Sequence, residues 1–187
     1  MRLSRRKIFA PLAVVVAVLG TARVMGASDR DPWASLHRPL QLKALPAGAT
    51  CPVSPRHSLD RGHLSGVGSG PIYPLPSPFS AYDRRPGWLG SKTIWAWPTK
   101  LRTHAVYVLV RGIRLDQPGR MRFELGPQWG SAPLTGELHI NTSRTVGSYS
   151  QSRWSTTVTM LLVRAPGCYG LQLDSARGTS TIVVSGS

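Results

Sequence analysis

Short runs of β-branched, aromatic and aliphatic residues recur through the second half of the chain. The clearest is Ala105–Val110, which is apolar at every position, as expected of a strand covered on both faces. Residues 120–125 alternate strictly and place Met121, Phe123 and Leu125 on one face. Weaker runs of the same kind occupy residues 93–97, 134–140, 156–163, 169–173 and 181–184. No stretch sustains an apolar 3.6-residue period over three turns, so the pattern predicts an all-β fold.

Turn-forming residues separate these runs and favour a sandwich. Asp116–Gly119 and Ala165–Gly167 both contain Pro-Gly, which is typical of a turn between strands. About seven short strands in one domain indicate a β-sandwich or a barrel, and their uneven spacing favours the sandwich. Residues 51–92 are rich in proline and glycine, which disfavours long helices. We expect them to lie over the surface of the sandwich as short edge strands and turns.

The N-terminus has the order of an export signal. Basic residues at positions 2, 5, 6 and 7 precede an uncharged apolar run over residues 8–20, and small residues follow. The run has 13 residues, short of the ~20 needed to cross a bilayer as a helix, which favours a cleaved signal peptide over residues 1–27. Ser4–Phe9 also resembles the twin-arginine export motif, with an ordinary basic segment as the alternative. Either route predicts a bacterial protein of the cell envelope or extracellular space.

The remaining chain divides by composition. We interpret residues 28–50 as a linker or arm and residues 51–187 as the sandwich domain. The chain has two cysteines, Cys51 and Cys168, which in an oxidising compartment are expected to form a disulfide, with two free thiols as the alternative. There is no Cys-x-x-Cys spacing to indicate a zinc or redox motif.

The charge balance is strongly basic even without the signal. Five of the 23 Lys and Arg lie in residues 1–27, which leaves 18 against eight acids, a net charge of +10. Such a surface attracts an anionic envelope polymer or an anionic lipid surface, and a glycan is a further candidate partner. Export makes nucleic acid an unlikely partner. A charge that serves solubility alone is the competing interpretation.

Three segments carry a resemblance to a known group. They are residues 87–97, residues 110–119 and Arg164–Tyr169, the last of which contains Pro-Gly-Cys-Tyr at the entry to a strand. Together they resemble a group of small uncharacterised exported bacterial proteins with an immunoglobulin-like β-sandwich domain. The resemblance implies that sandwich with the cysteine pair bridged, and it implies no activity. Independently of it, Tyr169 shares a face with Leu171 and Leu173, so we expect a core tyrosine whose hydroxyl bonds a nearby carbonyl, as in a tyrosine corner.

Four arginines around the Asp116 turn form the first candidate binding site. If the strands on either side of the turn form a hairpin, we expect their guanidinium groups to line one outer surface that suits phosphate or carboxylate groups. The alternative is a solvated outer sheet face. The four are Arg111, Arg114, Arg120 and Arg122.

Tryptophans form the second candidate site, for sugar rings. Trp95 and Trp97 share a strand face, and we expect one or both in the core. Trp88, Trp129 and Trp154 lie in expected loops, where exposed indoles could stack on a sugar, with packing against the sandwich as the alternative.

Catalysis has little support in the sequence. Eight acids are few, and no hydrolase, zinc-helix or phosphate-loop motif occurs, so no cofactor is predicted. His57, Asp60 and His63 are metal-ligand types, but Arg56 and Arg61 beside them would repel a cation. The sequence therefore favours a non-enzymatic exported module that binds an anionic or carbohydrate component of the cell envelope. An exported hydrolase around that histidine cluster, or a protein–protein interaction module, is the alternative.

Overall fold

The structure is a computed structural model that describes residues 31–59, 64–126, 129–144, 147–148 and 153–186. Within these residues the fold is all-β, as predicted, and helical structure is limited to the short 3-10 turns η1 (Ala34–Leu36) and η2 (Thr99–Arg102). The signal peptide predicted over residues 1–27 lies outside the described residues.

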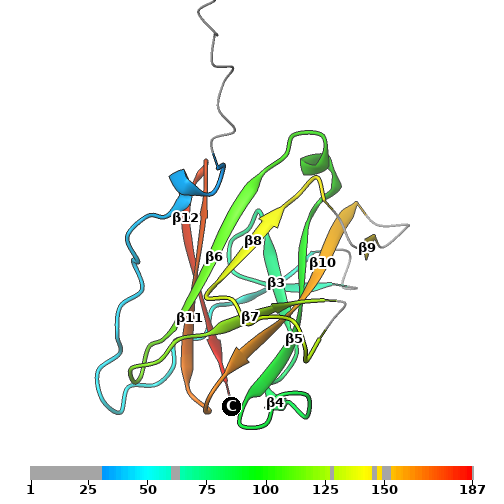
Figure 1. The fold of residues 1–187 in the computed structure, drawn as a ribbon. Coiled ribbons are helices and arrows are strands. Elements are labelled where there is room, and N and C mark those ends of the chain that lie inside the picture. Colours follow the sequence, from blue (N-terminus) through cyan, green and yellow to red (C-terminus); the bar gives the residue numbers. More distant parts are fainter. Residues whose placement is uncertain (1–30, 60–63, 127–128, 145–146, 149–152, 187) are drawn as a thin grey trace, which may run out of the picture. The chain divides into compact units, whose positions relative to one another are not determined.

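Two antiparallel sheets make the fold (Figure 1). The six-stranded sheet has the order β3 (Tyr73–Pro76), β5 (Leu89–Pro98), β10 (Trp154–Val163) and β7 (Arg122–Leu125), with β4 (Ser80–Ala81) paired to β5 and β9 (Gly147–Ser148) paired to β10. The four-stranded sheet has the order β12 (Gly178–Ser185), β11 (Cys168–Ser175), β6 (Tyr107–Arg114) and β8 (Glu137–Asn141). A separate antiparallel pair joins β1 (Arg56–Ser58) to β2 (Ser65–Val67).

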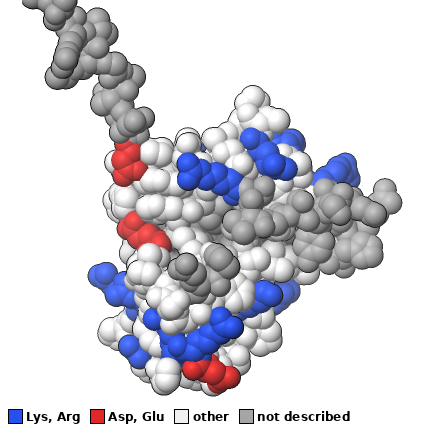
Figure 2. Space-filling model, turned by 45° about the vertical axis from the view of Figure 1, so that its right-hand side comes forward, with Lys and Arg blue, Asp and Glu red and all other residues white. Residues whose placement is uncertain are grey.

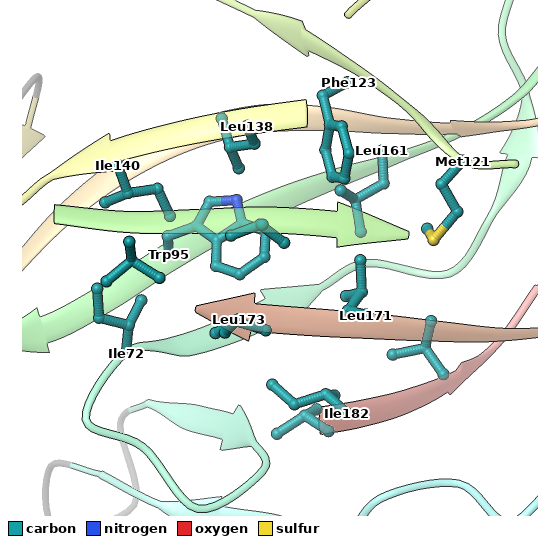
Figure 3. Packing of buried hydrophobic residues seen from close by; sticks show 14 of the residues in the cluster. Ile72, Trp95, Met121, Phe123, Leu138, Ile140, Leu161, Leu171, Leu173 and Ile182 are labelled. Atoms are coloured by element: carbon teal, nitrogen blue, oxygen red, sulfur yellow. The ribbon is translucent and has the colours of Figure 1, made fainter. Parts of the chain in front are cut away.

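One hydrophobic core lies between the two sheets, which makes the fold a sandwich (Figure 3). The six-stranded sheet contributes Trp95, Trp97 and Leu161, and all three side chains are fully buried. The facing sheet contributes Leu171 and other aliphatic side chains at alternate positions, as the pleat of a strand requires. The prediction that one or both strand tryptophans fill the core is therefore confirmed. The Trp95 indole N–H donates to the Thr159 hydroxyl at 2.8 Å, which satisfies a polar group that burial would otherwise leave unpaired.

The alternating runs found in the sequence all become strands, and the Pro/Gly-rich residues 51–92 hold more structure than the pattern indicated. They supply β1 to β4 and the first residues of β5. Ile72 and Phe79 from this stretch also enter the core, so it is part of the sandwich as well as a surface wrap. The short strands agree with the expectation of edge strands and turns, but the pattern did not indicate the buried side chains.

The chain changes sheets after the Asp116 turn. Arg120 lies opposite Ile113, and the Met121 N–H donates to the Gly112 carbonyl at 3.1 Å, so the turn does begin as a hairpin. The next strand, β7, then joins the six-stranded sheet, whereas β6 stays in the other. Glycine suits the crossing, because a Cβ on Gly112 would lie 2.9 Å from the Met121 Cβ and 2.6 Å from its sulfur, so that Met121 would have to shift. The hairpin on which the arginine hypothesis depends therefore holds only for its first pairs.

Two predicted contacts lie at the end of the sandwich where β11 begins. Cys51 and Cys168 form a disulfide with Cα atoms 5.5 Å apart, which confirms the predicted pairing. Tyr169 is buried, and its hydroxyl donates to the Ala165 carbonyl at 2.6 Å, which confirms the core tyrosine.

Residues 31–55, which we call the arm, run across the outer face of the four-stranded sheet (Figure 1). The Gln41 N–H donates to the Gln172 side chain at 2.6 Å, and the Ser54 N–H donates to the Val183 carbonyl at 2.9 Å. Leu36 of the arm is buried. Because the arm covers one face of β11 and the core covers the other, all residues of that strand are buried.

Candidate functional site

The four candidate arginines do not form one surface. Arg111 and Arg114 lie three positions apart on β6 and therefore point to opposite faces of the strand. Arg122 lies in the other sheet. Arg120 is exposed at the hairpin and Arg122 is half-buried. The surface expected from a continuous hairpin is absent among these described residues because the chain crosses between the sheets.

Arg111 serves to hold the arm. Its guanidinium contacts the Asp174 carboxylate at 2.7 Å and donates to the Arg38 carbonyl of the arm. The Gln172 amide donates to Asp174 at 3.0 Å and to the Pro39 carbonyl at 3.0 Å. A buried carboxylate is tolerated only when it is paired and hydrogen-bonded in this way. This cluster therefore ties the arm to the sheet and leaves Arg111 little capacity for an external anion.

Arg114 is occupied by the turn that it precedes. Its Nε donates to Asp116 at 2.8 Å, and its Nη2 donates to the Pro166 carbonyl at 2.8 Å. The guanidinium, together with the Cys168 backbone N–H, lowers the pKa of Asp116 to about 2. This pair fixes the turn against the start of β11.

The three candidate tryptophans lie in different surroundings. Trp88 is stacked under the Arg164 guanidinium, 3.9 Å from its ring centroid. Trp154 packs edge-on against Tyr73, with ring centroids 5.8 Å apart. Trp129 lines a groove of about 850 Å³ at the side of the sandwich. Trp88 and Trp154 are not among the described lining residues of this groove.

One wall of this groove belongs to the outer face of the six-stranded sheet. On β5, Trp95 and Trp97 point into the core, so Lys92 points outward. Its ammonium lies 5.7 Å from the Trp129 ring centroid, within the range of a cation–π contact. Glycine is needed beneath the indole, because a Cβ on Gly126 would lie 2.6 Å from the indole nitrogen.

The opposite wall belongs to the outer face of the four-stranded sheet and to the arm. Trp33 of the arm stacks on His139 of β8, with ring centroids 4.3 Å apart and planes at 13°. Tyr107 of β6 meets Trp33 edge-on at 5.1 Å, and Arg144 follows β8 on the same wall. None of these residues was singled out in the sequence. Trp33 could have been, because it is the one aromatic residue in the polar segment 28–50.

The groove is electropositive. Lys92 and Arg144 line it, and no Asp or Glu is among its described lining residues. The nearest acid on β8, Glu137, is turned to His37 at 2.9 Å, with His139 at 3.5 Å. The Glu137 hydrogen bond raises the pKa of His37 despite partial desolvation. Figure 2 shows that Lys and Arg exceed Asp and Glu on the face it displays.

A buried carboxylate supports the Trp129 wall. Glu124 on β7 is fully buried and accepts hydrogen bonds from Arg85 at 2.7 Å, Gly130 N–H at 2.7 Å and the Tyr82 hydroxyl at 3.0 Å. Burial alone would raise the pKa of Glu124, but these donors outweigh it and hold the pKa below its ordinary value. Because Gly130 follows Trp129 directly, the Glu124 cluster fixes the backbone that carries the indole.

Only one of the three residues of the candidate hydrolase site is described by the structure. His57 lies exposed in β1, whereas Asp60 and His63 lie outside the described residues. Among the described residues, no group of three His, Cys, Asp or Glu side chains is placed to hold a metal ion.

No family model, no curated protein and no solved structure matches the chain. None of the helices in the described part of the chain has the length and apolar character needed to traverse a bilayer. The class of protein is therefore defined by its fold and groove alone: an all-β, disulfide-closed sandwich with one electropositive aromatic groove among its described residues.

Proposed function

We propose that this protein is a non-catalytic module that binds an acidic carbohydrate chain of the cell envelope or its surroundings. The observation that carries the proposal is the composition of the groove. Trp33, Tyr107 and Trp129 line it together with Lys92 and Arg144, and no carboxylate is among its described lining residues.

The chemistry of these side chains suits an acidic sugar. Indole and phenol rings offer flat apolar surfaces to the C–H face of a pyranose ring. An ammonium and a guanidinium attract a sugar carboxylate or phosphate, and salt weakens that attraction. A groove of about 850 Å³ exceeds what a single sugar ring occupies.

The same groove favours binding over hydrolysis. Glycosidases of the common type place two carboxyl groups across the scissile bond. Here the described lining offers no carboxylate, and Glu124, Asp174 and Asp116 are held in ion pairs elsewhere.

Export to the cell envelope or beyond is part of this proposal. The basic and apolar N-terminal pattern supports a cleaved signal, by the twin-arginine or the general route. The Cys51–Cys168 disulfide is typical of oxidising compartments. We extend the proposal to kinship with small exported bacterial proteins of the immunoglobulin-like type, which the Pro-Gly-Cys-Tyr segment supports.

Calorimetric titration of the oxidised protein with polygalacturonate, at low and high salt, tests the function. We expect saturable, salt-sensitive binding, no binding of neutral dextran, and weaker binding to vesicles of anionic phospholipid. Lys92→Gln should weaken binding several-fold, whereas Arg120→Gln, which removes the same charge outside the groove, should not. Equal loss in both variants, or equal binding of vesicles, would reduce the interaction to non-specific charge attraction and contradict the proposal.

A further inference from the structure

The aromatic groups of the groove form two separate platforms. On β8, Leu138 and Ile140 point into the core, so His139 and the Trp33 ring stacked on it lie on the outer side of the four-stranded sheet. Lys92 and Trp129 lie on the outer side of the other sheet. The platforms therefore belong to opposite faces of the sandwich, whose layers pack ~10 Å apart.

The free edges of two strands lie between these platforms. β8 is the last described strand of its sheet. β10 pairs with β5 along one edge, but its other edge carries no described strand at Thr157 and Val158, since β9 pairs there with residues 155–156 and β7 with residues 159–162. Thr157 and Val158 both line the groove. A ligand that touches both platforms must cross this polar backbone edge.

We infer that the groove recognises an acidic oligosaccharide long enough to cross the edge of the sandwich, with one ring on Trp129 beside Lys92 and another on Trp33 beside Arg144. This inference rests on the proposed function and adds to it a minimum length of the ligand. Sugar hydroxyls along the chain would meet the backbone groups at the free edges. A single sugar reaches one platform only and gains about half of the contacts.

An extended peptide added to β8 is the competing occupant, and the strand edge argues against it. The N–H of Thr142, the residue after β8, donates to the carbonyl of Val106, the residue before β6. Alternation along β8 therefore turns the backbone groups of residues 137, 139 and 141 away from β6, toward the free edge. The Thr135 hydroxyl already occupies the Glu137 carbonyl, and the Arg144 N–H occupies the Asn141 carbonyl. Only His139 keeps both groups for a new strand, and strand addition depends on a row of main-chain hydrogen bonds.

A length series of oligogalacturonates, from the monomer to the hexamer, tests the inference by calorimetry. We expect affinity to rise at least tenfold once the chain spans both platforms and then to level off. Trp33→Ala should abolish this rise, so that the hexamer binds this variant no more tightly than the shortest binding oligomer does. Trp33→Phe, which keeps an aromatic face, should restore most of it, and Trp88→Ala, a tryptophan removed outside the groove, should change nothing.

The outcomes separate this inference from the function on which it rests. Equal affinity for short and long oligomers would overturn the two-platform inference while the proposed function stood. Binding of no oligomer would overturn both. Tighter binding of polyglutamate than of the hexamer would overturn the inference in favour of strand addition. The unfolding midpoint of each variant, measured in the same buffer, shows that the comparison is made on folded protein.

Discussion

Replacing Glu124 with glutamine perturbs the buried cluster behind Trp129 without changing the shape of the side chain. The amide keeps one oxygen for the Tyr82 hydroxyl but turns an NH₂ group toward the Arg85 guanidinium and the Gly130 N–H. Donors then face donors, and Arg85 loses its charge partner. Breaking a buried ion pair on one side costs ~3–5 kcal/mol. Because the Arg85 side chain is 20% exposed and regains some water, we expect a loss near the lower figure, about 3 kcal/mol.

Urea unfolding of the oxidised protein measures this loss. In thermal unfolding of a domain of this size, the same loss of about 3 kcal/mol corresponds to a fall of about 9 °C in Tm. The pKa of Glu124 is depressed, so its contribution is complete above the pKa of the unfolded carboxyl, about 4.3, and is lost as the pH falls toward the folded value. The difference between Glu124→Gln and the native protein should therefore shrink in acid.

Glu137→Gln is the matched control, since it removes a carboxylate of a half-exposed pair and should cost under about 1 kcal/mol. If Glu124→Gln cost no more than this control at neutral pH, the reasoning about the buried cluster would be refuted. If the difference in unfolding free energy between the native protein and Glu124→Gln stayed constant in acid, the depressed pKa of Glu124 would be contradicted.

Four further outcomes follow from the same contacts. Tyr169→Phe should cost about 1 kcal/mol in urea unfolding, because one buried hydrogen bond is lost while the ring stays packed. Replacing Cys51 and Cys168 with serine should destabilise the protein by up to about 5 kcal/mol, given the 117-residue separation. Reductant should lower the unfolding midpoint of the native protein and leave that of the double variant unchanged. Arg111→Gln should speed tryptic cleavage of the arm at least several-fold, seen by mass spectrometry, because the arm loses its anchor. NMR titration should find Asp116 ionising near pH 2, so its stabilising ion pair is lost only as the pH falls toward that value.

The strands and the contacts of Cys168 and Tyr169 could be predicted because the sequence patterns that indicate them are local. Alternation at Met121 and Phe123 reports a buried face directly, and a Pro-Gly turn before Cys168 places Tyr169 toward the core. The disulfide could be predicted from the presence of two cysteines and the expected oxidising compartment. The immunoglobulin-like strand order stays a prediction.

The site could not be predicted, because it depends on which sheet each strand joins. Nothing local in the sequence marks the crossing at Gly112, so four arginines near one turn suggested one surface. Arg111 is occupied by the Arg38 carbonyl of the arm, some seventy residues away in the sequence, and by the Asp174 carboxylate. The pairing of Trp33 with Trp129 in one groove likewise arises only when the arm is laid across the sandwich.

The most direct test of an acidic-glycan groove is to observe the six indole N–H signals by two-dimensional NMR during a titration with oligogalacturonate. We expect the signals of Trp33 and Trp129 to shift progressively while those of the core residues Trp95 and Trp97 stay in place. Shifts confined to Trp88 and Trp154, or no shift at saturating ligand, would contradict the account.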